Sequence, residues 1–97
     1  MEMKDENFFE WDEEKNNINI EKHQVIFYEA QKAFLDLNRV VLKDLDHSVD
    51  EDRFFCLGKV EGNVITVRFV RRKNTIRIFG AGYWRKGKKI YEKENKI

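Results

Sequence analysis

Proline is absent from this 97-residue chain, and glycine occurs only five times. Both residues mark turns and linkers, so their scarcity gives no sign of a linker between two domains. Cysteine occurs once, at Cys56, which excludes an intramolecular disulfide and a structural zinc site built on paired thiolates. Because phenylalanine and leucine flank Cys56, we expect its thiol to be buried.

Long apolar runs are also missing. No stretch approaches the roughly 20 apolar residues that a membrane-spanning helix needs, and the chain begins without the apolar run of a signal peptide. We therefore expect a cytoplasmic protein that does not contact membranes. Hydrophobic residues still make up 41% of the chain, with eight Phe, three Tyr and two Trp, which argues against disorder. This length fits one domain, and we expect that domain to span residues 1–97.

The two halves of the chain carry opposite charge. Residues 1–52 hold 15 acidic and 6 basic side chains, a net charge of −9, whereas residues 53–97 hold 3 acidic and 13 basic side chains, a net charge of +10. A basic surface attracts a polyanion, because each phosphate that it neutralises releases condensed counterions. Nucleic acid is therefore the first partner to consider.

The apolar spacing predicts an α+β fold in which an antiparallel sheet packs on helices. Asp12 can cap the first helix, and the closely spaced runs in the second half predict a meander joined by tight hairpins. The expected order is β-α-α-β-β-β-β-α. The expected elements are a strand at 8–11, a helix from 13 to about 23, a helix from 27, strands at 39–43, 53–60, 63–71 and 75–81, and a basic helix at 84–94.

Strand alternation sorts the arginines by face, because side chains two residues apart point the same way. If the apolar faces of the last two strands pack on the helices, Arg68 and Arg77 lie together on the open face of the sheet. Such a face, with Phe79 or Tyr83 available for base stacking, can bind single-stranded RNA. A merely solvated face that protects an exposed sheet is the alternative.

Three blocks of residues stand in order along the chain. They are Phe9-Glu10-Trp11-Asp12 with Lys15, Lys22-His23, Val25, Phe27 and Glu29-Ala30; Asp44 with Asp46-His47-Ser48, Glu51 and Arg53; and Ile76-Arg77-Ile78 with Ala81 and Tyr91-Glu92. Together they resemble the BrnT family, the ribonuclease toxins of bacterial type II toxin–antitoxin systems. The resemblance spans about residues 8–92, which we take as the core of the domain.

The resemblance implies a RelE-like microbial ribonuclease fold and an endoribonuclease activity that inhibits translation and growth. It also implies neutralisation by a cognate BrnA-like antitoxin in a hetero-oligomer, with the ribosome as a further candidate partner. Such enzymes use neither a metal nor a cofactor, since the ribose 2′-hydroxyl attacks its own phosphate. The protein must then accept a proton, stabilise added negative charge and help the 5′-oxygen to leave.

The resemblance and the residue chemistry together give candidate site residues. Guanidinium groups grip phosphate oxygens in pairs, and Arg77, Arg72 and Arg53 are the candidates for that role. Histidine exchanges protons near neutral pH, and we take His23 as the catalytic candidate and His47 as part of a structural loop. A structural role for His23, such as packing on Trp11, is the alternative. Further RNA contacts are expected from Lys22, Arg68, Arg71, Arg85, Lys86 and Lys88.

Two positions depart from the family pattern. Arg71-Arg72 replaces a hairpin glutamate, and Gly80-Ala81-Gly82 replaces a Ser-Ala-Arg run; the closing helix is also more basic than usual. These changes favour a second hypothesis, in which the same basic face binds RNA or an antitoxin without catalysis. RNA cleavage separates the two hypotheses.

Overall fold

The structure is a computed structural model that describes residues 8–97, so residues 1–7 of the predicted domain lie outside the described residues. Its elements are β1 (Phe8–Glu10), α1 (Glu13–His23), α2 (Phe27–Ala30), the 3-10 helix η2 (Gln31–Leu35), β2 (Val40–Lys43), β3 (Arg53–Val60), β4 (Asn63–Arg72), β5 (Thr75–Gly82) and α3 (Arg85–Glu94). The α+β class and the order of elements are confirmed. The second helix differs from the prediction, since it makes one α-helical turn and continues as η2.

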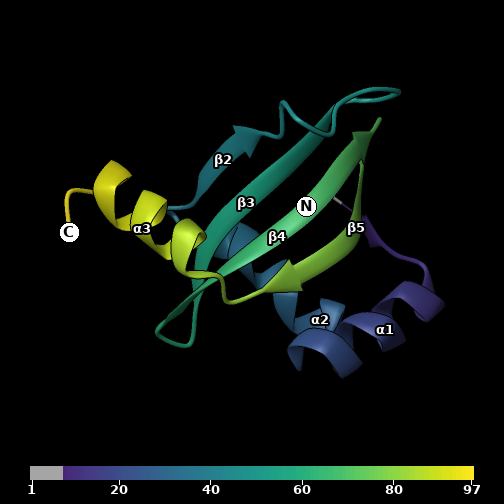
Figure 1. The fold of residues 1–97 in the computed structure, drawn as a ribbon, viewed down its shortest axis with the longest axis horizontal. Helices are drawn as coiled ribbons and strands as arrows, with labels where there is room; N and C mark the ends of the chain where they lie inside the picture. Colours follow the sequence, from purple (N-terminus) through teal and green to yellow (C-terminus); the bar gives the residue numbers. More distant parts are fainter. Residues whose placement is uncertain (1–7) are drawn as a thin grey trace, which may run out of the picture.

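The five strands form one sheet in the order β1-β5-β4-β3-β2 (Figure 1). The pairs β3–β4 and β4–β5 are antiparallel, as the hairpin spacing predicts, and β2 also pairs with β3 in the antiparallel sense. β1 runs parallel to β5, with Phe9 opposite Ile76. The sequence did not predict this pairing, because a three-residue strand carries no pattern that identifies its partner. No helix in the described part of the chain is long and apolar enough to cross a membrane.

One face of the sheet packs on α2 and η2, and α1 lies beside β5 (Figure 1). Phe27 and Phe69 are fully buried there, and the ring of Phe34 packs edge-on against Phe69 at 5.0 Å. The thiol of Cys56 is buried in the same core, as predicted, and burial raises its pKa to about 12. Gly58 allows the close approach of η2, since a Cβ at this position would lie 2.3 Å from the Ala33 carbonyl oxygen.

The other face is covered at one end only, where α3 packs on Leu57 and Val64 through Tyr91. The Tyr91 hydroxyl donates a hydrogen bond of 2.6 Å to Asp36 Oδ2, which also accepts the Lys59 N–H at 2.7 Å. Burial would raise the pKa of Asp36, but the hydrogen bonds from Tyr91, Lys59 and Asn38 outweigh it and hold that pKa below its ordinary value. Asp36 therefore links α3 to the end of β3, and the rest of this face stays open.

We expect Tyr91→Phe to lower the free energy of unfolding by about 2 kcal/mol, because it removes a hydrogen bond to a charged acceptor. Burial and the hydrogen bond to Asp36 raise the pKa of Tyr91 in the folded protein from its ordinary value of 10.0 to about 12. The stabilisation by this hydrogen bond is therefore complete below pH 10.0 and is lost as the pH rises from 10.0 to about 12. Urea unfolding at a series of pH values from about 9 to about 12 measures the effect.

Tyr28→Phe is the matched control, since Tyr28 is 58% exposed on α2. The control should behave as the wild type does, whereas Tyr91→Phe should lose less stability with rising pH. The same pH slope in all three proteins would contradict the role assigned to Tyr91.

Candidate active site

Four arginines lie on the open face of the sheet. Arg53 and Arg77 stand opposite Val70 from the two sides, so all three side chains share one row. Alternation along β4 places Arg68 and Arg72 on the same face as Val70. The prediction that Arg68 and Arg77 share the open face is therefore confirmed.

A β-bulge in β5 places an aromatic ring among these arginines. Arg68 stands opposite Gly80 and Phe69 opposite Ile78, which leaves Phe79 without a partner on β4. The Phe79 ring centroid lies 5.1 Å from the guanidinium carbon of Arg53 and 5.0 Å from that of Arg68. These cation–π contacts hold two cations side by side with their charge still available. Arg53 forms no ion pair with a carboxylate of residues 8–97, and the nearby Glu51 pairs with Arg72 instead.

A cleft of about 170 Å³ lies between α1 and β5, beside Phe79. Its cationic lining comes from Lys15, Lys22 and Arg68, and its other walls include His23 and Trp84. The His23 ring packs edge-on against Trp84, with the ring centroids 5.1 Å apart. The sequence suggested Trp11 as the aromatic neighbour of His23, and that suggestion is wrong.

Local structure explains why these groups meet. The buried side chain of Asn19 on α1 donates to the carbonyls of Val25 and Ala81, each at 2.9 Å, and accepts the Ala81 N–H at 3.1 Å. These bonds join the last turns of α1 to the end of β5. Trp84 packs over Gly82, where an added Cβ would lie 3.0 Å from the indole ring. The helix end, the strand end and the indole ring therefore form one rigid wall.

Two of the four arginines are paired with carboxylates. Arg77 contacts Glu10 at 3.2 Å, and Arg72 contacts Glu51 at 3.1 Å. Both pairs are partly solvated, and pairs of this kind contribute about 1 kcal/mol or less. The hydrogen bond and the charge of Glu51 raise the pKa of Arg72, which stays charged. A phosphate can therefore displace either carboxylate at small cost.

The loop from β2 to β3 positions Arg53. Asp44 Oδ2 contacts His47 Nδ1 at 2.9 Å, and the Ser48 hydroxyl donates to the Asp44 carbonyl at 2.6 Å. The same hydroxyl accepts the Arg53 N–H at 2.9 Å. His47 thus takes part in the structure of the loop, as expected, and does not line the cleft.

The other predicted RNA contacts lie elsewhere. Alternation places Arg71 on the opposite face from Arg68, at the β4–β5 hairpin. Arg85 and Lys88 line a groove beside α3, and Lys86 lines an apolar groove on the open face. Sequence reasoning missed Lys15 and Trp84, because their approach depends on how α1 docks. Within residues 8–97 no group of three His, Cys, Asp or Glu side chains is placed to hold a metal ion.

The family described as ribonuclease toxin, BrnT, of type II toxin-antitoxin system matches residues 11–87. The matched segment begins before α1 and ends in α3, so it contains the cleft and the four arginines of the open face. This match confirms the resemblance inferred from the sequence. No curated protein matches the chain.

We expect Ser48→Ala to lower the free energy of unfolding by about 1 to 2 kcal/mol, because it leaves the Arg53 N–H without its acceptor. Val49→Ala is the matched control, since Val49 is 85% exposed in the same loop. Urea unfolding measures both effects. Equal stabilities for the two variants would show that the hydroxyl does not hold the start of β3.

Proposed function

Because the chain belongs to the BrnT family of ribonuclease toxins of type II toxin–antitoxin systems, we propose that it is an endoribonuclease that cuts RNA at the cleft between α1 and β5. The observation that supports this site best is that His23 lines one cleft with Arg68 and Phe79, and that the Phe79 ring also contacts Arg53. The cleft therefore holds a group that can exchange protons and a cation that can hold a phosphate, with a second cation at the Phe79 ring.

The proposed reaction uses the ribose 2′-hydroxyl as nucleophile. This oxygen attacks the adjacent phosphorus, and the bond to the 5′-oxygen breaks, which leaves a 2′,3′-cyclic phosphate and a free 5′-hydroxyl. His23 exchanges the protons that leave the 2′-oxygen and reach the 5′-oxygen. Arg68 and Arg53 bind the non-bridging phosphate oxygens, whose negative charge increases in the transition state. No step in this scheme uses a metal or a cofactor.

Arg77 and Arg72 have a supporting role in this proposal. Arg77 lies on the open face in the same row as Arg53, and Arg72 lies one row further along β4. Each is held by a carboxylate in the described structure. RNA phosphates that flank the cleaved bond would replace Glu10 and Glu51. Lys22, at the cleft, would contact the same strand. The proposed enzyme acts in the cytoplasm, where its RNA substrate is, and we propose residues 1–97 as its single domain, with the core at about residues 8–92.

We expect His23→Gln to slow RNA cleavage by about 10² to 10⁴-fold, because it removes proton transfer while RNA binding continues. His47→Gln is the matched control, since His47 belongs to the loop and should leave the rate unchanged. Arg68→Ala should slow RNA cleavage by about 10² to 10³-fold, and Arg71→Ala, on the opposite face, should slow it much less. End-labelled RNA in excess chelator gives the rates, with a 2′-deoxy substrate that must stay intact.

Other results would change the proposal in distinct ways. Loss of cleavage in chelator would remove the metal-independent mechanism. Equal losses for His23→Gln and His47→Gln would remove His23 from the chemistry. RNA that is bound but never cut, with purified ribosomes present, would favour the non-catalytic binding module.

A BrnA-like antitoxin is the proposed partner, and an apolar groove of about 430 Å³ on the open face offers it a docking surface. Leu42, Phe55 and Ile90 line this groove, and Lys43 and Lys86 stand at its rim. An acidic segment with apolar side chains fits this arrangement. Such a segment would also cover the neighbouring arginines, which explains how binding would block the site.

We expect Leu42→Lys to weaken antitoxin binding at least tenfold, because it places a charge in the apolar groove. Val41→Lys is the matched control, since Val41 is 46% exposed and its side chain points to the other face of β2. Titration of the antitoxin with each variant by calorimetry gives the dissociation constants. Equal weakening by both variants, or by neither, would place the antitoxin elsewhere.

A further inference from the structure

A second basic hollow lies at the end of the molecule away from Arg77. It has a volume of about 680 Å³, against about 170 Å³ for the cleft, and it runs between the β3–β4 turn and α3. Four cations and two aromatic side chains line it: Lys59, Arg85, Lys88, Lys89, Tyr83 and Trp84. Glu92 is the one acidic side chain in this lining. We call this hollow the α3 groove.

The cations of the α3 groove have no carboxylate partners among residues 8–97. The ion pairs found there involve Lys32, Lys43, His47, Arg72 and Arg77, none of which lines the groove. Unpaired cations that face one another repel, and a polyanion that enters the groove removes this repulsion. The groove is therefore electrostatically prepared for phosphate groups.

The start of α3 has an unfavourable charge distribution without an anion. Its first turn carries Arg85 and Lys86 and no acidic residue, and no side chain of residues 8–97 caps it. Cations at a helix N-terminus oppose the helix dipole by about 0.3 to 1 kcal/mol each. A bound phosphate would offset this repulsion.

The exposed aromatic rings of the α3 groove favour a nucleic acid over an acidic protein segment as its ligand. Tyr83 is 55% exposed and Trp84 is 36% exposed, so both rings can stack on nucleobases. An acidic protein segment would use the cations but would gain little from flat exposed rings. The combination of unpaired cations and exposed rings is typical of surfaces that bind single-stranded nucleic acid.

Trp84 joins this groove to the proposed site of cleavage. Its indole ring is part of the lining of both the α3 groove and the cleft that contains His23. A strand bound at the cleft can therefore continue over Trp84 into the α3 groove without leaving the basic surface.

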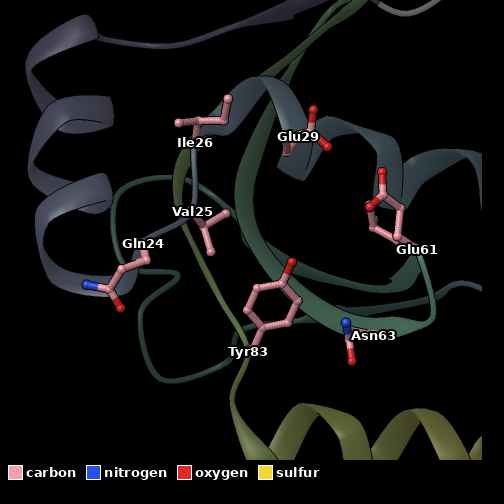
Figure 2. A pocket seen from close by; sticks show the side chains of 8 residues that line it. Gln24, Val25, Ile26, Glu29, Glu61, Asn63 and Tyr83 are labelled. Carbon is pink, nitrogen blue, oxygen red and sulfur yellow. The ribbon is translucent and has the colours of Figure 1, made fainter.

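Tyr83 marks the far boundary of the groove. Figure 2 shows its ring between Val25 and Asn63, with Glu29 and Glu61 on the side away from α3. Glu29 is paired with Lys32, and Glu61 would repel phosphates that pass beyond Tyr83. The path open to a nucleic-acid strand is thus limited to the α3 side of this ring.

We propose that the α3 groove is an extended binding site for single-stranded RNA that holds the nucleotides on one side of the cleaved bond. This inference rests on the proposed ribonuclease function. It adds that the enzyme binds a strand several nucleotides long, mainly through phosphates and stacked bases and with little dependence on sequence. Lys59, Lys88 and Lys89 contact phosphates, and Tyr83 and Trp84 stack on bases.

The test compares a trinucleotide with a strand of about 12 nucleotides, within the range of single-strand sites. Both carry 2′-O-methyl groups, so that neither can be cut during binding measurements. Lys88→Ala/Lys89→Ala should bind the long strand about tenfold more weakly than the wild type and should bind the trinucleotide equally well. Two lost phosphate contacts should also reduce the slope of log affinity against log salt by about 1.4.

Lys93→Ala/Lys96→Ala is the matched control, because it removes the same charge outside the groove lining: Lys93 lies in the last turn of α3, and Lys96 follows the helix. It should bind both strands as the wild type does. Tyr83→Ala should weaken binding of the long strand and Tyr83→Phe should restore it. Equal weakening of long-strand binding by both double lysine variants would contradict the proposed RNA site. The proposal would also be wrong if Lys88→Ala/Lys89→Ala lost binding to an acidic peptide but bound the long RNA as the wild type does.

Cleavage assays separate this inference from the proposed function. If the wild type cuts RNA, and Lys88→Ala/Lys89→Ala has the same KM for long RNA as the wild type, the proposed RNA site in the α3 groove is wrong and the ribonuclease function is unaffected. If the wild type cuts no RNA, but the groove variant selectively loses the long strand, the groove stands as a binding site and the catalytic proposal fails.

Discussion

The buried amide of Asn19 is the interaction on which the proposed site depends. It bonds the chain that leaves α1, at Val25, and the end of β5, at Ala81, which lies 62 residues after Asn19 in sequence. A buried amide without partners is strongly unfavourable, so this arrangement has few alternatives. It fixes the end of α1 beside the bulged strand, which brings His23 to Trp84 and into one cleft with Arg68. The chemistry of the site is thus positioned by a residue that takes no part in it.

The sheet separates stability from function by face. The face toward α2 and η2 is closed and apolar, and it contains the large rings of the core. The other face is apolar only beneath α3, and the remainder carries guanidinium groups around Phe79. Substitutions on the open face can therefore alter RNA or antitoxin binding with little effect on folding. The charge asymmetry of the sequence has its structural counterpart in this division.

Local patterns predicted much of the fold, and long-range contacts account for what they missed. Alternation in β4 placed Arg68 on the open face, and the Asp12 side chain caps α1 as expected. Gly80 is a local sign of the bulge at Phe79, since a glycine inside a strand often marks one, but it does not identify the residue that is left without a partner. Likewise, the contact of His23 with Trp84 arises from the docking of α1, which no periodicity describes. The RelE-like architecture remains a prediction.

The parallel pairing of β1 with β5 has a consequence for the order of folding during synthesis. β1 is made early, yet its partner follows some 65 residues later, after the whole meander. His23 likewise cannot make its ring contact with Trp84 until residue 84 has been synthesised. Contacts this distant in sequence form late, because the intervening chain must first be present and ordered. A nascent chain thus lacks the assembled site while most of it is still being translated, and the finished molecule acquires the site as a unit.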